Sequence, residues 1–300
     1  MVKKKVVVII GPTASGKTSM AVDLASNING EIISADSRQV YREMDIGTGK
    51  DLEEYGSIPY HLIDIVDAGD EFTVSDFQIL AHAALKKISS KECTPIICGG
   101  TCHYVKALLE DYTFNNIKSN RDFTEKLELL DRQTLYRHLK DYGLWESHHW
   151  ESDSRRRIVR AIEKKTNEID RKNQIFDFKG QYITRIYCPE VERPILKTKI
   201  RDRLLLRLNQ GMIEEVDALL KRGVSHERLE RYGLEYKWIS RFLRDLITKT
   251  DLIEKLQVEI ARYAKRQMTF IRYMKRCGHP IIPVSKTEEL VADAKNWLLK

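Results

Sequence analysis

Eight residues near the start of the chain have the types and spacing of a phosphate-binding loop. The pattern G-x-x-x-x-G-K-[ST] is matched in full by Gly11, Pro12, Thr13, Ala14, Ser15, Gly16, Lys17 and Thr18. Such a loop directs backbone N–H groups at phosphate oxygens, and the helix that follows adds the positive end of its dipole. Lys17 supplies a cation to the terminal phosphate, and the Thr18 hydroxyl is a candidate ligand for Mg²⁺. The motif predicts a diphosphate-binding site but no reaction, because kinases, other ATP-binding proteins and some transferases share it.

Two further residues follow strand-like apolar runs and suit proton or phosphate chemistry. Asp36 comes directly after the run 31–35 and is a candidate general base or an indirect partner of Mg²⁺. A loop aspartate that only caps a helix is the alternative. Thr101 follows Gly99 and Gly100 after the run 95–98, so its hydroxyl is expected at the same edge, unless this is only a tight turn.

The phosphate loop requires a strand before it and a helix after it, and the pattern of the whole chain provides more of both. Strands are predicted at 6–10, 31–35, 61–65, 95–98, 182–187 and 280–284, and helices at 17–27, 74–89, 192–221 and 251–276. Strands that alternate with helices indicate an α/β fold, here a P-loop NTPase-like parallel sheet core with helices on both faces. Ligands bind such sheets at the carboxyl ends of the strands.

Residues 115–182 differ from this pattern, because they are polar, charged and helical, with a strand signal only at their end. We expect residues 1–114 and 183–300 to form the catalytic core and 115–182 to form a small all-helical insertion domain. The charge is also distributed unevenly. Residues 1–110 contain 11 of the 51 Lys+Arg residues and 15 of the 44 Asp+Glu residues, so residues 111–300 contain 40 Lys+Arg and 29 Asp+Glu. The first part is therefore −4 and the second +11. This asymmetry favours a polyanionic partner, although charged helix faces exposed only to solvent would give the same pattern.

The overall composition narrows the class of protein. Of the 300 residues, 42% are hydrophobic and 32% are charged, and no apolar run approaches the roughly 20 residues that span a bilayer. We therefore expect no membrane partner. The five cysteines form no CxxC pair and no zinc-binding spacing, which fits a cytoplasmic protein.

Six stretches resemble one known family, the tRNA dimethylallyltransferase (tRNA isopentenyltransferase) family. They are GPTASGKT at 11–18, ISADSRQVYREMDIGTGK at 33–50, GGT at 99–101, DSRRRIVRAIE at 153–163, RLNQGMIEEVDALL at 207–220 and AKRQMTFIRY at 264–273. They span most of the chain in the family's order. Three places depart from it: Cys102-His103-Tyr104 stands for Gly-Leu-Tyr, Tyr232–Tyr236 for a segment resembling Ile-Gly-Tyr-Lys-Glu, and Phe270 for Trp.

The resemblance implies a reaction and roles for several residues. A dimethylallyl group passes from dimethylallyl diphosphate to N6 of the adenosine on the 3′ side of the anticodon in tRNA, and diphosphate is released. Asp36 would accept the proton, while Lys17, Thr101, Arg203 and Mg²⁺ on Thr18 would stabilise the leaving group. A monomer is expected.

The acceptor adenine must leave the stack of the anticodon loop to reach a buried donor. By resemblance Asp36, Ser37, Arg38 and Gln39 would contact this base and its neighbours. Two basic stripes are expected to hold the RNA backbone: Arg155, Arg156, Arg157 and Arg160 in the insertion, and Arg262, Lys265 and Arg266 on the late helix. A solvated helix face is the alternative for each stripe alone.

Three other functions fit parts of this pattern. A P-loop small-molecule kinase would use the insertion's arginines as a lid. A prenyltransferase acting on free adenine nucleotides would not need the positive second part. An RNA-binding protein with an inactive P-loop would explain the altered segments at 102–104 and 232–236.

Overall fold

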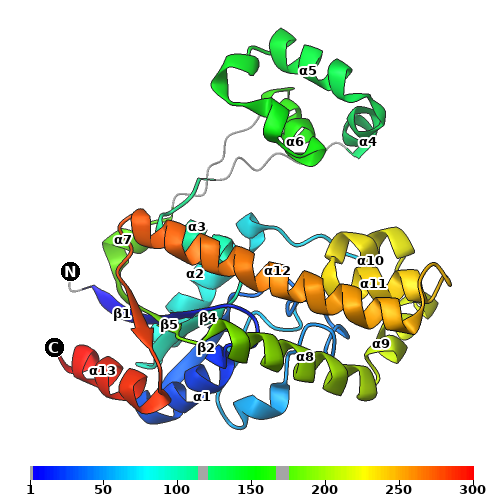
Figure 1. The fold of residues 1–300 in the computed structure, drawn as a ribbon. Helices are drawn as coiled ribbons and strands as arrows, with labels where there is room; N and C mark the ends of the chain where they lie inside the picture. Colours follow the sequence, from blue (N-terminus) through cyan, green and yellow to red (C-terminus); the bar gives the residue numbers. More distant parts are fainter. Residues whose placement is uncertain (1–2, 114–120, 167–175) are drawn as a thin grey trace. The chain divides into compact units, whose positions relative to one another are not determined.

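The computed structural model describes residues 3–113, 121–166 and 176–300 (Figure 1). It divides into a core unit, Met1–Asp111 with Phe176–Lys300, and a helical unit, Tyr112–Ile175. Residues 176–182, expected in the insertion, therefore lie in the core unit. The short helix α7 (Phe178–Gln181) is attached there because the backbone N–H groups of Phe178 and Lys179 donate to the Asp111 carboxylate, at 2.8 and 3.2 Å.

The core unit contains a six-stranded sheet whose described pairings are all parallel. Its strands are β1 (Lys4–Ile10), β2 (Gly30–Ser34), β3 (Tyr60–His61), β4 (Thr94–Gly99), β5 (Tyr182–Pro189) and β6 (Ile281–Val284). Their order is β3-β2-β4-β1-β5-β6, so β1 lies between β4 and β5. The chain thus leaves β1 toward β2 on one side and returns on its other side as β5, and ligands bind at such a change of direction.

Helices cover both faces of this sheet, which confirms the predicted α/β core (Figure 1). Val6, Val8 and Ile10 of β1 pack with α2 (Val74–Ser90), α3 (Cys102–Leu109) and the end of α12 (Lys249–Arg276). Val7 and Ile9 pack with α1 (Lys17–Ile28) and α13 (Thr287–Leu299). Burial on both faces explains why β1 is apolar at every position instead of alternating.

A second hydrophobic cluster joins the late helices to the loop after β2. It contains residues of α8 (Arg193–Asn209), α9 (Met212–Lys221), α10 (His226–Tyr232), α11 (Leu234–Phe242) and α12, with Val40, Tyr41 and Met44. The single helix predicted over 192–221 is wrong. Gly211 has a φ of 100°, which a right-handed helix excludes, so α8 ends and α9 begins there.

The strand predicted over 61–65 is also wrong, because β3 ends at His61. Leu62 and Asp64 have φ values of 65° and 55°, which turn the chain out of the sheet. It then runs beside residues 39–41, where Ile65 N donates to Val40 O at 2.8 Å. This path brings the Asp64 carboxylate to Lys50.

The helical unit has a small core of its own. Its helices are α4 (Arg121–Leu129), α5 (Arg132–Asp141) and α6 (Arg155–Thr166), with single turns at Trp145–Ser147 and Trp150–Ser152. Leu135, Leu139, Trp150 and Ile158 are buried among them. No helix among the described residues of either unit is long and apolar enough to cross a bilayer.

Candidate active site

A cleft of about 520 Å³ opens in the core unit at the carboxyl ends of β1, β2 and β4. Its walls include residues of the phosphate loop, residues 36–39, residues 47–49, Asp51 and residues of α8, α10, α11 and α12. Most of the residues predicted for donor binding and catalysis therefore lie around one cavity. Parallel strands bring their ends together in this way whatever their separation in sequence.

The phosphate loop has the geometry expected for binding an anion. Ala14 and Gly16 adopt positive φ values of 62° and 83°, and α1 begins at Lys17 directly after them. Lys17 Nζ donates to Pro12 O at 3.1 Å, which holds the ammonium group over its own loop. Burial lowers the pKa of Lys17. A phosphate would favour the charged form again, because an opposite charge nearby raises the pKa of a lysine.

Gln267 on α12 joins the phosphate loop to the end of β4. Its Oε1 accepts from Thr13 N at 2.8 Å, and its Nε2 donates to Gly100 O at 2.9 Å. Gln267 is not among the site residues that the sequence motifs predict. A signal was present, because Gln267 is a polar residue in the buried register of α12 that also contains Ala264 and Ile271.

Asp36 divides its carboxylate between structure and solvent. Oδ1 accepts from Arg38 N at 2.8 Å and from Gln39 N at 3.4 Å, which fixes the turn after β2. No described residue donates a hydrogen bond to Oδ2, and Asp36 lines the cleft. One oxygen therefore stabilises a turn, and no helix begins here as the capping alternative required. The other oxygen is available to a ligand.

Thr101 lies at the base of the same turn. Its Oγ1 accepts a hydrogen bond from Ser37 N at 3.0 Å, and its backbone N–H donates to Ala35 O at 3.1 Å. The same hydroxyl group also forms a hydrogen bond with the Tyr263 side chain. These contacts tie the end of β4 to the end of β2. The adjacent Cys102 is buried, which raises the pKa of its thiol to about 12, so it stays protonated at neutral pH.

Two arginines of α8 bring positive charge to the cleft. Arg203 Nη2 donates to Thr13 Oγ1 of the phosphate loop. Burial lowers the pKa of Arg203 to about 10, which leaves it charged at neutral pH. Arg207, one turn later, is buried and pairs with Asp51 at 3.1 Å. Burial raises the pKa of Glu235 on α11, against the opposing effect of both arginines.

Arg38 and Gln39 are held by residues far away in sequence. Arg38 Nε donates to Tyr232 O at 2.8 Å, and its guanidinium lies 5.5 Å from the centre of the Tyr232 ring. The amide of Gln39 accepts from Ser34 Oγ at 3.0 Å and donates to Gly49 O at 2.9 Å. Both side chains border the cleft.

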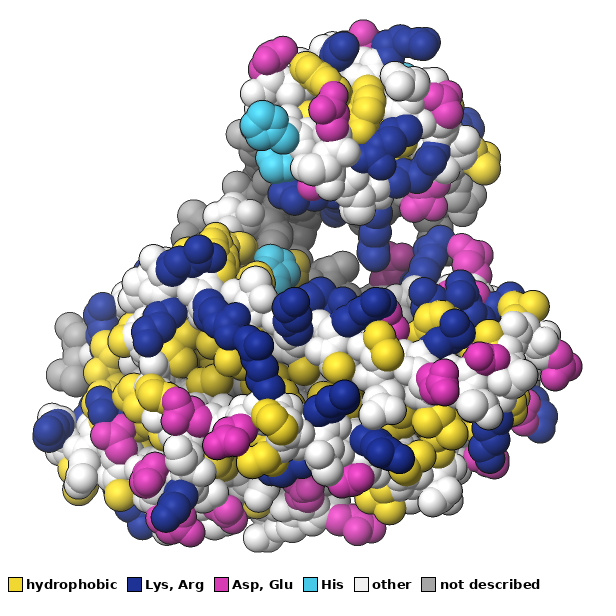
Figure 2. Space-filling view, viewed as in Figure 1, with side chains coloured by type: hydrophobic (Ala, Val, Ile, Leu, Met, Phe, Trp, Pro, Cys, Tyr) yellow, Lys and Arg dark blue, Asp and Glu magenta, His cyan; other side chains and the backbone are white. Residues whose placement is uncertain are grey.

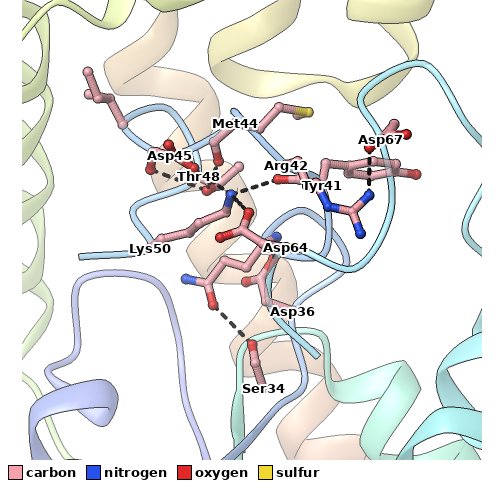
Figure 3. Close-up of polar contacts among 12 residues, drawn as sticks. Ser34, Asp36, Tyr41, Arg42, Met44, Asp45, Thr48, Lys50, Asp64 and Asp67 are labelled. Atoms are coloured by element: carbon pink, nitrogen blue, oxygen red, sulfur yellow. Dashed lines mark hydrogen bonds and ion pairs between the residues drawn. The ribbon is translucent and has the colours of Figure 1, made fainter. Parts of the chain in front are cut away.

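The loop that contributes Gly47–Gly49 to the cleft is held by a buried lysine, Lys50 (Figure 3). Its Nζ donates to Tyr41 O at 2.7 Å and to Asp45 Oδ1 at 2.5 Å, and it also pairs with Asp64. Two carboxylates and a carbonyl therefore compensate the charge that burial would otherwise penalise.

The basic residues of α12 are not equivalent. Arg266 lines the cleft, whereas Arg262 and Lys265 lie on the exposed face and Arg262 pairs with Glu259 at 2.7 Å. Figure 2 shows Lys and Arg side chains gathered over this helix, with hydrophobic groups between them. Within the core unit, Arg262, Lys265 and Arg266 of α12 could therefore contact a polyanion.

In the helical unit the four predicted arginines divide into two pairs. Arg157 forms an ion pair with Asp153 at 2.9 Å, and Arg160 forms one with the buried Glu163 at 2.8 Å. Arg155 and Arg156 are exposed at the start of α6, and within the described residues no ion pair engages either of them. These two are therefore the better candidates for contacts with phosphate.

The arrangement can bind a diphosphate beside a carboxylate oxygen. Lys17, Arg203 and residues of the phosphate loop line the cleft together with Asp36, whose Oδ2 receives no hydrogen bond from a described residue. That combination suits the departure of diphosphate from a substrate whose attacking group loses a proton.

Comparison with known proteins gives a consistent result. The family model described as IPP transferase matches residues 39–274. A tRNA dimethylallyltransferase of Geotalea uraniireducens is 44% identical over 273 residues, which cover 90% of this chain and 89% of that protein. Another, from Treponema denticola, is 39% identical and covers 99% of this chain and 97% of its own length.

Two solved structures share the fold over nearly the whole chain. The full-length tRNA isopentenylpyrophosphate transferase of Bacillus halodurans has a TM-score of 0.71 and 31% identity, covering 99% of this chain and 96% of that one. A eukaryotic dimethylallyltransferase acting on tRNA has a TM-score of 0.76 and 25% identity, covering 99% of this chain and 78% of that one.

Proposed function

The chain belongs to the IPP transferase family, and we propose that it transfers a dimethylallyl group from dimethylallyl diphosphate to N6 of the adenosine on the 3′ side of the anticodon in tRNA. One observation carries the assignment of residues. The phosphate loop, Arg203 and Asp36, whose Oδ2 receives no hydrogen bond from a described residue, border a single cleft. A diphosphate leaving group and a proton acceptor are the two things that this reaction needs from the protein.

The donor's diphosphate is assigned to the phosphate loop. Its oxygens accept from the backbone N–H groups at the start of α1, and Lys17 and Arg203 supply positive charge. Thr13 is already held by Gln267 and Arg203, so the loop needs little rearrangement to bind. Preformed donors of this kind stabilise charge as it develops in the transition state.

The bond changes follow from this placement. The lone pair of adenine N6 forms a bond to the allylic carbon, and the carbon–oxygen bond breaks with its electron pair going to diphosphate. The N6 proton passes to Asp36 Oδ2. Negative charge on the departing oxygen is stabilised by Lys17 and Arg203, while Thr101 holds the Asp36–Ser37 turn in position.

The site also fits Mg²⁺ held together with the donor. Thr18 lines the cleft next to Lys17, and within the described ranges no cluster of three His, Cys, Asp or Glu side chains could hold a metal alone. Mg²⁺ commonly binds through substrate phosphates and waters with few protein ligands. When bound, it would neutralise part of the diphosphate charge, with the Thr18 hydroxyl as its protein ligand.

A tRNA acceptor is supported by the named relatives and by the positive charge available to its backbone. Arg262, Lys265 and Arg266 offer cations on the core unit, and Arg155 and Arg156 offer them on the helical unit. A modified base must be removed from its stack to reach a cleft of this kind. Ser37, Arg38 and Gln39 form the part of the wall next to Asp36, where such a base would lie.

The choice of acceptor can be tested directly. The protein is incubated with dimethylallyl diphosphate, Mg²⁺ and either unmodified tRNA or AMP, and the nucleosides are analysed by mass spectrometry. We expect prenyl-adenosine only from tRNA, and none from a tRNA in which the adenosine next to the anticodon is replaced by guanosine. Modification of AMP at a comparable rate would contradict the proposal.

A further inference from the structure

A carboxylate outside the predicted site holds one wall of the cleft. Glu215 of α9 accepts three consecutive backbone N–H groups: Asp45 N and Ile46 N reach Oε2 at 2.8 and 2.6 Å, and Gly47 N reaches Oε1 at 3.1 Å. The hydroxyl of Tyr236 also donates to Oε1, at 2.8 Å. Consecutive N–H groups that converge on one point form an anion-binding concavity, which here is filled by a side chain of the protein itself.

The loop continues from the residues held by Glu215 into the wall of the cleft. Gly47, Thr48 and Gly49 line the cleft there. A Cβ atom on Gly47 would lie 2.7 Å from the Tyr236 hydroxyl, and one on Gly49 would lie 1.7 Å from Arg207 Nη2. A side chain at Gly47 or Gly49 would therefore displace the Tyr236 hydroxyl or the Arg207 guanidinium, and the φ of 63° at Gly49 also favours glycine.

The same loop fixes a residue that borders the acceptor side of the cleft. Gly49 O accepts from the Gln39 amide NH₂ group at 2.9 Å, and Ser34 Oγ donates to the oxygen of the same amide at 3.0 Å. Lys50 anchors the loop from behind through Asp45, Asp64 and Tyr41 O. A displacement of residues 45–47 would thus reach Gln39 through Gly49.

We propose that Glu215 is a positioning residue for the acceptor nucleotide: by holding residues 45–47 it keeps Gly49 and, through it, Gln39 in the arrangement that receives the adenosine. This inference rests on the proposed function. It assigns to Glu215 an effect on the acceptor, not on the donor, since the phosphate loop is held separately by Gln267 and Arg203.

Tyr236 belongs to the same device and lies in the segment that departs from the family pattern. It is buried, and its hydroxyl is bonded to Glu215. Burial raises the pKa of Tyr236 well above its ordinary value, so the phenol stays protonated as a donor. The departure at 232–236 therefore supplies a partner for Glu215 in this chain.

The informative substitution is Glu215→Gln, with Glu214→Gln as the matched control on the exposed face of α9. Glutamine keeps the shape, but in either orientation its NH₂ group faces N–H or O–H donors that a carboxylate accepted. We expect KM for tRNA to rise about tenfold, the effect of losing one such hydrogen bond. We expect KM for dimethylallyl diphosphate to stay within about threefold, and the control to match wild type.

A double-mutant cycle with Gln39→Ala separates positioning from general destabilisation. If Glu215 acts through Gln39, the double variant raises KM for tRNA little more than the larger single effect. Additive effects, or an unchanged KM for tRNA in Glu215→Gln, overturn the inference. An equal rise in both KM values together with a lower Tm also overturns the inference.

Absence of prenyl transfer by the wild-type protein would instead refute the proposed function. If Glu215→Gln does not fold, Tyr236→Phe is a milder variant, because it removes one hydrogen bond to Glu215 and keeps the carboxylate.

Discussion

We propose two tasks for Asp36, one for each carboxylate oxygen. Oδ1 accepts from Arg38 N and Gln39 N, and Oδ2, to which no described residue donates a hydrogen bond, is the proposed proton acceptor. In Asp36→Asn the amide oxygen can keep the first role, so the turn should survive. The second role requires a proton acceptor, which an amide does not provide. We expect the transfer step in single-turnover experiments to slow by about 10²–10⁴-fold.

Binding measurements complete the test of Asp36. Both substrates should bind Asp36→Asn nearly as they bind the wild type, because the side-chain volume and the turn are retained. An unaltered transfer rate would show that Asp36 only arranges its neighbours.

We assign Lys17 and Thr18, which line the cleft at the start of α1, to the donor and not to the acceptor. Lys17→Ala and Thr18→Ala should lower kcat/KM for the donor by about 10²–10³-fold, as expected for removing one preformed group from a developing negative charge. Filter binding of tRNA should change little. A matching loss of tRNA affinity would contradict the assignment of these residues to the diphosphate.

Local motifs in the sequence pointed to the phosphate loop, Asp36 and Thr101, each of which comes shortly after the end of a strand. Because strand ends meet by topology, residues of the phosphate loop and Asp36 line one cleft, whereas Thr101 contacts the turn at Ser37 and is not a lining residue. Gln267 and Glu215 could not be placed in this way. Each acts on backbone more than 150 residues away in sequence, at Thr13 and at residues 45–47, and only packing of helices creates those contacts.

At the scale of elements, apolar periodicity located most helices and strands but not where two of them end. The amphipathic pattern continues through Gly211, yet its φ of 100° divides α8 from α9. Likewise 61–65 is apolar enough for a strand, yet Leu62 and Asp64 take positive φ values. In both places tertiary contacts select a backbone conformation that periodicity does not report.

Helix α2 carries a buried histidine that should make stability depend on pH. His82 is 6% exposed and its ring stacks on Phe176, with centres 4.3 Å apart. Burial lowers the pKa of His82 from 6.5 to about 4. Between these values the unfolded chain binds a proton that the folded chain does not, so the free energy of unfolding falls as pH falls through this window.

The histidine contribution can be isolated by urea unfolding at two pH values. Between pH 7 and pH 4.5, His82 should account for about 2 kcal/mol of lost stability. His82→Leu should remove that part, so its loss over the same range should be smaller than in the wild type. Equal pH dependence of the two proteins would show that His82 titrates normally.

At the scale of the whole molecule, the charge of +11 in residues 111–300 is the main electrostatic feature. The structure refines which cations are available. Arg157 and Arg160 are paired with Asp153 and Glu163, whereas Arg155 and Arg156 are exposed at the start of α6. Arg155 and Arg156 are therefore the first of the four predicted arginines to test for phosphate contacts.

Replacing both Arg155 and Arg156 by alanine should weaken the binding of all tRNAs by about the same factor. It should also flatten the plot of log affinity against log salt by up to about two units, near one per lost phosphate contact. Arg157→Ala, whose guanidinium is already paired, is the matched control and should change the slope less. Saturating tRNA should restore most of the maximal rate. An unchanged slope, or a rate that saturating tRNA does not restore, would contradict this role.

We propose that the phosphate loop binds a prenyl diphosphate and that no nucleoside triphosphate takes part in the reaction. The most direct measurement follows released diphosphate and prenyl-adenosine together, with unmodified tRNA, dimethylallyl diphosphate and Mg²⁺ and with ATP either present or omitted. We predict one diphosphate released for each adenosine modified, at the same rate without ATP, and neither product from Lys17→Ala at low donor concentration. Prenyl transfer that requires ATP, or ATP turnover without any modified adenosine, would contradict the claim.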